Sequence, residues 1–318
     1  MDASEAGALL QRIEGAIGGV VVGQSAAIRE TLLATVAGGH AILEGVPGTA
    51  KTLLVRVLAK AFSCRFTRVQ FTPDLMPADI TGVGIPEGAG GGFTFRKGPV
   101  FTDFLLADEI NRAPAKTQAA LLEAMQERQV TADGARHPLG DLFTVFATQN
   151  PVEFEGTYRL PEAELDRFLV KVRIDYPAPE DEDRVLDLHR RGFDADREET
   201  FGVTAVASAD DLRALRDAAR TVRVDDRLVS YIRTIVGTTR KAAALSMGAG
   251  PRASVGLLKI ARAAALIEGR DFVTPDDVKA RAAPVLRHRV VLDPEYEMEG
   301  VGPDAVVAEI LGRVEAPK

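Results

Sequence analysis

The chain has 318 residues, of which 46% are hydrophobic and 27% charged, so it is long enough to form two globular domains. Its formal net charge of −7 argues against a surface built for non-specific binding of nucleic acid or of anionic membranes, because both need a basic excess. A local basic patch over residues 281–289 remains open as an exception.

The compartment is indicated by the cysteine content and by the N-terminus. A single cysteine, Cys64, excludes an internal disulfide framework and suits a reducing compartment. The chain begins Met-Asp-Ala-Ser-Glu, which is acidic where a signal peptide is basic, and the apolar run 16–23 is too short to span a bilayer. We therefore expect a cytoplasmic protein without membrane insertion.

Helically spaced apolar residues predict one helix ending near residue 18 and a second over residues 25–37. The apolar segment between them, residues 20–22, lies just upstream of a glycine-rich loop. Such a segment is compatible with the wall of an adenine pocket or with plain core packing.

A phosphate-binding loop is indicated within residues 40–54. The apolar run 41–43 predicts a buried strand, and Lys51 and Thr52 open an apolar-periodic helix. In this arrangement the backbone N–H groups of the loop and the positive helix end converge on one point. Lys51 would neutralise the β and γ phosphates of a nucleotide, and the Thr52 hydroxyl would ligate magnesium. The loop consists of Gly45, Val46, Pro47, Gly48, Thr49 and Ala50.

Ala50 departs from the pattern G-x-x-x-x-G-K-[ST], which has a second glycine at this position. A Cβ there costs on the order of 1 kcal/mol if the backbone needs a positive φ. The alternative interpretation is a glycine-rich turn that holds no ligand.

A pair of candidate catalytic acids follows some fifty residues later. The apolar run 104–107 ends in Asp108 and Glu109, as expected for a buried parallel strand that presents acids at its carboxyl end. Asp108 would help to hold magnesium, and Glu109 would polarise an attacking water. Two adjacent acids are also common in turns and caps, but their position after a phosphate loop favours catalysis.

Two hairpins are predicted in this half of the chain. The glycine-rich segment 82–99 indicates a projecting hairpin with a flexible tip at 88–92, which is either a surface lever or an inert loop. The second lies over residues 130–139, and we interpret His137 at its tip as a solvated residue rather than a metal ligand. A strand over residues 142–147 then leads to Asn150, whose amide can orient a water or simply end the strand.

The last predicted strand covers residues 169–174, and the prolines of Tyr-Pro-Ala-Pro at 176–179 favour an extended linker. We therefore expect domains over residues 1–176 and 177–318, the second all-helical. Its helices are predicted over 181–190, 208–220, 225–240 and 254–268, and a fifth begins at Thr274. Arg252 opposes the dipole of the fourth helix unless an anion lies nearby.

Five segments together resemble the MoxR family of AAA+ ATPases, in the helix-2-insert group. The resemblance implies a P-loop NTPase core, an αβα sandwich with a parallel sheet, followed by an all-α AAA+ lid. It also implies a homo-oligomeric, hexameric ring that hydrolyses ATP with Mg²⁺ at subunit interfaces. The segments are Gly-Val-Pro-Gly-Thr-Ala-Lys-Thr, Leu-Leu-Ala-Asp-Glu-Ile-Asn-Arg-Ala-Pro, Ala-Thr-Gln-Asn-Pro, Leu-Pro-Glu-Ala-Glu-Leu-Asp-Arg-Phe and Gly-Pro-Arg-Ala-Ser.

The resemblance also implies roles for single residues. Asn150 corresponds to the first sensor, Arg167 to the arginine finger and Arg252 to the lid sensor, while Gly23 and Gln24 fall where the family contacts adenine. Lys51, Thr52, Asp108 and Glu109 keep the roles given above, and the family tolerates alanine at Ala50. Two departures flank the finger: Arg159 stands where the family usually has proline, and Glu164 where it usually has glutamine.

The leading functional hypothesis is an ATPase that remodels a client or helps to insert a metal or cofactor into a partner enzyme, as similar proteins do alongside von Willebrand A domain proteins. The alternative is a nucleotide-sensing ring scaffold with little turnover. A small-molecule kinase does not explain the helical lid, and the Asn-Lys-x-Asp run of a GTPase is absent. The acidic charge disfavours DNA translocation.

Overall fold

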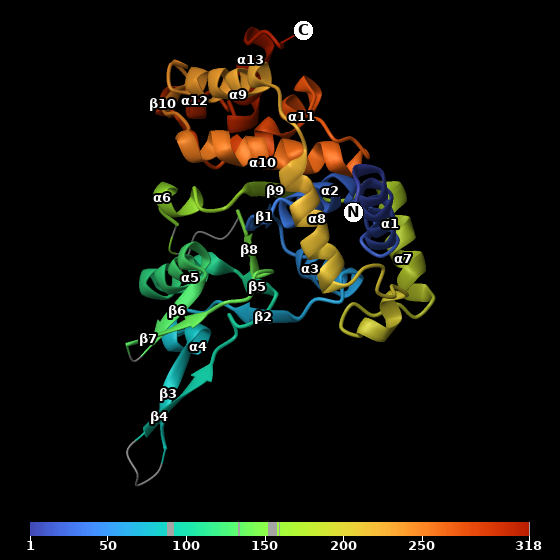
Figure 1. Cartoon of the computed structure of the whole chain (residues 1–318), viewed down its shortest axis with the longest axis vertical. Helices are drawn as coiled ribbons and strands as arrows, with labels where there is room; N and C mark the ends of the chain where they lie inside the picture. The colour runs from blue at the N-terminus through green and yellow to red at the C-terminus, as the bar shows by residue number, and fades with distance from the viewer. Residues whose placement is uncertain (88–91, 133, 152–157, 159, 318) are drawn as a thin grey trace.

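The computed structural model describes residues 1–87, 92–132, 134–151, 158 and 160–317 (Figure 1). Its centre is a five-stranded sheet in the order β2-β5-β8-β1-β9, with every neighbouring pair parallel. The carboxyl ends of all five strands therefore lie at one edge of the sheet, where ligands of such sheets bind. The strands are β1 (Ala41–Gly45), β2 (Phe66–Gln70), β5 (Phe104–Asp108), β8 (Thr144–Gln149) and β9 (Val170–Ile174).

Helices cover both faces of the sheet, because each central strand is apolar on both sides. Alternate β5 residues face opposite layers: Phe104 and Leu106 enter one buried cluster, and Leu105 and Ala107 enter the other. The first face carries α1 (Ala3–Gly18), α2 (Ser25–Val36) and α3 (Lys51–Ala61). The second carries α5 (Ala115–Glu127), against which α4 (Pro77–Thr81) packs. The predicted P-loop αβα sandwich is thus confirmed.

Two antiparallel hairpins extend from this core. The hairpin of β3 (Gly82–Glu87) and β4 (Gly92–Lys97) projects far from the body of the molecule (Figure 1). Residues 88–91 of its predicted flexible tip lie outside the described residues. β6 (Gln129–Ala132) and β7 (Ala135–Pro138) form the second hairpin.

The prediction for His137 needs a correction. It lies in β7 rather than at the tip, and its ring stacks on Phe95 of β4 with the centroids 3.9 Å apart. The sequence pattern of one hairpin does not reveal this contact, because the partner ring belongs to the other hairpin. The stack joins the two hairpins.

The C-terminal region is mainly helical, and the caps explain several of its boundaries. Ser208 with Asp211, and Thr274 with Asp277, form capping boxes, and Pro275 occupies the first turn behind Thr274. The helices are α7 (Pro179–Arg190), α8 (Ala209–Thr221), α9 (Asp226–Thr239), α10 (Pro251–Ile267), α11 (Pro275–Leu286), α12 (Pro294–Met298) and α13 (Pro303–Arg313), with a 3-10 turn at Glu198–Phe201.

Two expectations for this region are wrong. It is not all-helical, because β10 (Leu245–Met247) and β11 (Val291–Leu292) pair antiparallel, and the Ser246 hydroxyl donates to the Leu292 carbonyl at 2.9 Å. α10 begins at Pro251, three residues earlier than predicted. Because α10 packs on α1 and α2, the two regions share one buried cluster, and the boundary at residue 176 stays a prediction.

Residues 281–289 do not form a surface patch either. Arg289 is buried, and the Arg287 Nε donates to the Asp304 carboxylate at 3.0 Å. These cations hold elements of the fold together. Among the described residues, no helix combines the length and apolar character needed to cross a membrane.

Candidate active site

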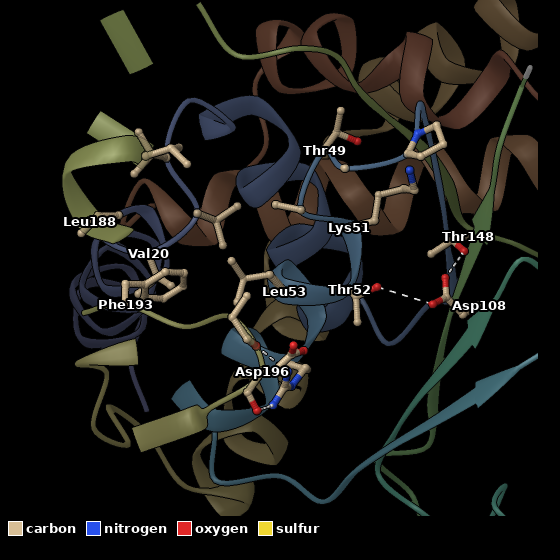
Figure 2. Close-up of a pocket in the computed structure, with 18 of the residues that line it drawn as sticks. Val20, Thr49, Lys51, Thr52, Leu53, Asp108, Thr148, Leu188, Phe193 and Asp196 are labelled. Carbon is tan, nitrogen blue, oxygen red and sulfur yellow. Dashed lines mark hydrogen bonds between the residues drawn. The ribbon is translucent and has the colours of Figure 1, made fainter. Parts of the chain in front are cut away.

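A cavity of about 440 Å³ opens at the carboxyl edge of the sheet. Figure 2 shows its two kinds of wall. Lys51, Thr52, Asp108 and Thr148 gather at one side, while Val20, Leu188 and Phe193 lie at the other, with Leu53 between them. The polar side suits a phosphate chain and the apolar side suits a base.

The phosphate loop connects β1 to α3. Gly48 has φ +82°, and Ala50 has φ 64° and ψ 22°, so the position where the motif has glycine does adopt the left-handed conformation. The Lys51 ammonium donates to the carbonyls of Gly45 and Val46 at 2.7 and 2.6 Å. Burial lowers the pKa of Lys51, against the opposing effect of the Asp108 and Glu109 charges.

The Asp108 carboxylate lies directly across from the loop. The Thr52 hydroxyl is 3.5 Å from its Oδ2, and the Thr148 hydroxyl donates to its Oδ1 at 2.5 Å (Figure 2). Arg68 of β2 donates from Nε to Oδ2 at 2.9 Å. A hydroxyl and a carboxylate oxygen this close form the hard oxygen donor set that Mg²⁺ prefers, so the residues present fit that ion.

Glu109 is held by three groups. Its backbone N–H donates to the Thr148 hydroxyl at 2.8 Å. Its Oε2 accepts from the Gln70 amide at 2.7 Å and from Arg112 at 3.2 Å. The backbone of Glu109 is left-handed, with φ 56°, a conformation that costs energy for a residue with a Cβ and that turns its carboxylate into the cavity rim.

Asn150 follows the last residue of β8 and lines the same cavity, with only 9% of its surface exposed. The parallel pairing of β5 with β8 brings it to the same edge as Asp108 and Glu109. The three polar residues predicted at the ends of β5 and β8, Asp108, Glu109 and Asn150, thus line one cavity.

Gly23 and Gln24, the expected adenine contacts, do not line the cavity. The Gln24 amide donates to the Asp175 carbonyl at 2.8 Å, and a Cβ on Gly23 would lie 2.9 Å from that of Pro177. Both residues therefore hold the segment after α1 against the segment before α7. The apolar wall is formed instead by Val20, Val21 and Val22 with α7 and the loop after it, contributing Val185, Leu188, His189 and Phe193.

Arg167 and Arg252 do not line the cavity, although both were expected to serve the nucleotide. Arg167 follows α6 (Glu162–Leu165), and its buried Nε and Nη1 have no hydrogen-bond partner among the described residues. Arg252 lies beside it and donates to Asp166 at 3.2 Å. Figure 1 shows α6 and α7 at opposite sides of the molecule, so these arginines and the cavity lie on different flanks. Of the two departures near the finger, Glu164 lines a hollow with Arg167, and Arg159 lies outside the described residues.

Sequence reasoning missed four residues that organise the site. Three of them, Arg68, Gln70 and Thr148, contact Asp108 or Glu109. The fourth, Arg289, is buried and donates from Nε to Asp166 at 2.7 Å, next to Arg167. The alternation of Arg68 and Gln70 around Val69 in β2 was the available signal for the first two.

Comparisons with known proteins agree with this geometry. Residues 40–170 match the model of the ATPase family associated with various cellular activities (AAA), and residues 237–310 match the AAA lid domain. The chain is 46% identical to the uncharacterised protein YeaC of Bacillus subtilis, over 94% of this chain and 92% of the relative. It is 43% identical to the chaperone MoxR1 of Mycobacterium tuberculosis, over 94% and 80% of the two chains.

A solved structure, that of a proposed ATPase from Cytophaga hutchinsonii, is 40% identical and superposes with a TM-score of 0.90, over 99% of this chain and 97% of the other. The glycine-rich loop after β1, the acidic pair after β5 and Asn150 after β8 occur here in the fold of such an ATPase. The chain therefore belongs to the MoxR-type AAA+ ATPases and is an ATP hydrolase.

Proposed function

We propose that this ATPase works as a homo-oligomeric ring, hexameric as in the family it resembles, and completes each catalytic site with an arginine from the neighbouring subunit. The observation that carries the proposal is the position of Arg167. It has two buried donor atoms without partners among the described residues, and it lies away from the cavity of its own chain. Arg167 also borders a surface hollow with Glu164, so its side chain is open to a phosphate of an adjacent subunit.

Within one subunit, the loop N–H groups and Lys51 bind the β and γ phosphates of ATP. Thr52 and Asp108 hold Mg²⁺, which, when bound, neutralises charge on the phosphate oxygens. Glu109 accepts a proton from the attacking water, and Gln70 and Arg112 fix the orientation of its carboxylate. Asn150 positions the water from the end of β8.

Between subunits, a ring needs a head-to-tail contact in which one flank of each chain meets the other flank of the next. α7, which lines the cavity, and α6, which precedes Arg167, lie on opposite sides of Figure 1. That arrangement is the one a closed ring with shared sites requires. Asp166, held by Arg252 and Arg289, sets the position of the turn that carries Arg167.

The work done by hydrolysis is, in this proposal, the remodelling of a partner protein, including preparation of a partner enzyme for its metal or cofactor. The name of the chaperone MoxR1 supports a client of this kind. We also propose a von Willebrand A domain protein as the companion and the cytoplasm as the compartment. A ring that only senses nucleotide is disfavoured, because Glu109 is held in place by two side chains at the cavity rim.

Mixing two inactive variants tests the shared site. Arg167→Ala and Lys51→Ala should each lose ATPase activity by at least about 10³-fold, since an arginine finger is worth roughly 10³ to 10⁵ in rate. In a mixture, some interfaces pair an intact phosphate loop with an intact Arg167, and phosphate release should partly return.

The matched control mixes Lys51→Ala with Arg233→Ala, which removes an exposed arginine of α9 and should retain activity in its own sites. Light scattering with ATP present establishes whether rings form and whether their mass is that of six chains. If mixed rings form but activity stays at the level of the separate variants, Arg167 acts only within its own chain.

A further inference from the structure

A second cavity, of about 490 Å³, lies at the opposite edge of the sheet, near the amino ends of the strands. Its walls come from the end of α2, the ends of the β6–β7 segment, α8 and α10. It is close in size to the nucleotide cavity, but nothing in the ATPase mechanism uses it. Five of the residues that line it are cations and one is an acid: Arg128, Arg216, Arg220, Lys259, Arg262 and Asp141.

The positive charge of this cavity is not balanced from within. The Asp141 carboxylate already accepts two bonds from Arg213, at 2.6 and 3.1 Å. Arg220 pairs with Asp217 at 2.9 Å, but both side chains are largely exposed, so that pair is weak. Among the described residues, no carboxylate pairs with Arg216, Lys259 or Arg262. The chain as a whole has a net charge of −7, so its overall composition does not account for this cluster of cations.

Arg216 is the fixed centre of the cluster, with 6% of its surface exposed. Its guanidinium donates to the carbonyls of Thr35 and Asp141, each at 3.0 Å, and to the Thr144 hydroxyl at 2.8 Å, all of them uncharged partners. Burial and then the charge of Arg128 lower the pKa of Arg216 to about 10.

The positive charges of this cluster also act on His40. Burial lowers the pKa of His40 to about 3, and the charges of Arg128, Arg216 and Lys259 contribute to the shift. The buried Nε of Arg262 has no hydrogen-bond partner among the described residues. An unpaired buried donor and mutually repelling cations are both relieved by one bound anion.

We propose that this basic cavity binds a small anion that carries several phosphate groups. A multiply charged phosphate chain matches a cluster of guanidinium and ammonium groups, which bind phosphate oxygens through charge-assisted hydrogen bonds. The lining residues include no aromatic ring on which a base would stack, and the remaining wall is small and apolar, so the phosphates rather than a base are recognised.

The cavity lies between the segment before β8 and the C-terminal helices, so a bound anion would connect them. Arg128 precedes the β6–β7 hairpin and Asp141 follows it, just before β8, whereas Lys259 and Arg262 lie on α10, whose first turn contains Arg252. An anion that bridges these groups ties the sensor strand to the C-terminal helices. The basic cavity and the nucleotide cavity have no lining residue in common, so binding at each can be tested separately.

The test is calorimetric titration of the full chain with tripolyphosphate, in the absence of nucleotide and magnesium. Lys259→Gln with Arg262→Gln should weaken the binding at least about tenfold, because two charges are removed from the cavity. The matched control, Arg233→Gln with Lys241→Gln, removes two charges from exposed positions and should change binding less than about twofold. If the cavity variant fails to fold, Arg220→Gln serves instead.

Repeating the titration in a Lys51→Ala background removes the contribution of the phosphate loop, so the result does not depend on how that loop acts. The same loss on Lys259→Gln with Arg262→Gln in that background supports the basic cavity. Tripolyphosphate binding that is undetectable at millimolar concentration, or equal in the cavity and control variants, overturns it. Binding of a short single-stranded DNA but not of tripolyphosphate also overturns it, because the recognised partner is then a nucleic acid.

Discussion

The two flanks of this ATPase differ in how completely their polar groups are satisfied. On the flank of the phosphate loop, Asp108 and Glu109 each have several partners in the same chain. On the flank that follows α6, Asp166 is bound by two arginines, but Arg167 keeps two buried nitrogens without a partner among the described residues. The acids of the first flank are thus paired within the chain, whereas the second flank carries the arginine that we propose acts on a neighbouring subunit.

The comparison separates two physical tasks. Residues that bind the nucleotide must be held before it arrives, because each loose group adds an entropic cost to binding. An arginine that acts across a contact must instead be left available while its backbone is fixed. The Asp166 cluster fixes the turn, and among the described residues no acceptor binds the Nε or Nη1 of Arg167.

The largest expected effects separate binding from chemistry on the complete flank. Lys51→Ala should abolish ATP binding, since Lys51 attracts the phosphates in the ground state. Glu109→Gln should retain binding and lower the hydrolysis rate by at least about 10³-fold, because Glu109 acts on the water only in the transition state. Nucleotide binding by fluorescence and phosphate release distinguish the two. Equal loss of binding in both variants would contradict the assignment.

The second prediction removes the carboxylate of Asp166, which pairs with Arg252 and Arg289 on the second flank. Asp166→Ala leaves the buried Arg289 without its carboxylate and should lower the free energy of unfolding by about 2 kcal/mol, discounted because Asp166 itself is partly exposed. Asp217→Ala, which removes the partner of the exposed Arg220, should cost less than about 0.5 kcal/mol. Urea unfolding of both variants measures the difference, and equal losses would show that the cluster is not a support.

A smaller effect is expected at Gln70. Gln70→Ala removes the 2.7 Å bond to Glu109 and should lower kcat about tenfold with little change in KM, because the carboxylate loses one of the groups that orient it. The matched variant Gln11→Ala, on the exposed face of α1 and away from both Glu109 and Arg167, should leave kcat unchanged within about twofold. Faster hydrolysis in Gln70→Ala would mean that the bond holds Glu109 in an idle orientation.

The smallest effect concerns the loop itself. Ala50→Gly should raise the free energy of unfolding by less than about 1 kcal/mol, since relief of the left-handed strain at φ 64° exceeds the added chain entropy of glycine. Ala37→Gly, at φ −68°, should lower it by a similar amount. Destabilisation by both would show that the Ala50 side chain contributes packing that outweighs the strain.

The difference between the flanks also explains which parts of the site could be predicted from the sequence. The phosphate loop and the acidic pair follow from short segments, because strand, loop and helix are neighbours in the chain. The partners of Glu109 and Asp166 come from strands and helices far away in sequence, so spacing gave no access to Gln70 or Arg289. For the same reason the basic patch left open at 281–289 proved to be internal at two of its arginines: Arg287 pairs with Asp304 and Arg289 with Asp166, which only the fold brings near.

The strand order has a consequence for how the protein is made. β1 carries the phosphate loop at its end, yet its two neighbours in the sheet, β8 and β9, follow more than 100 residues later in the chain. During synthesis both edges of β1 stay unpaired until β8 and β9 leave the ribosome, because its partner strands come later in the chain. Nascent chains that stop before residue 144 will lack β8 and Asn150 and will expose β1, an apolar strand with both edges unpaired. They are the species that we expect chaperones and proteases to intercept.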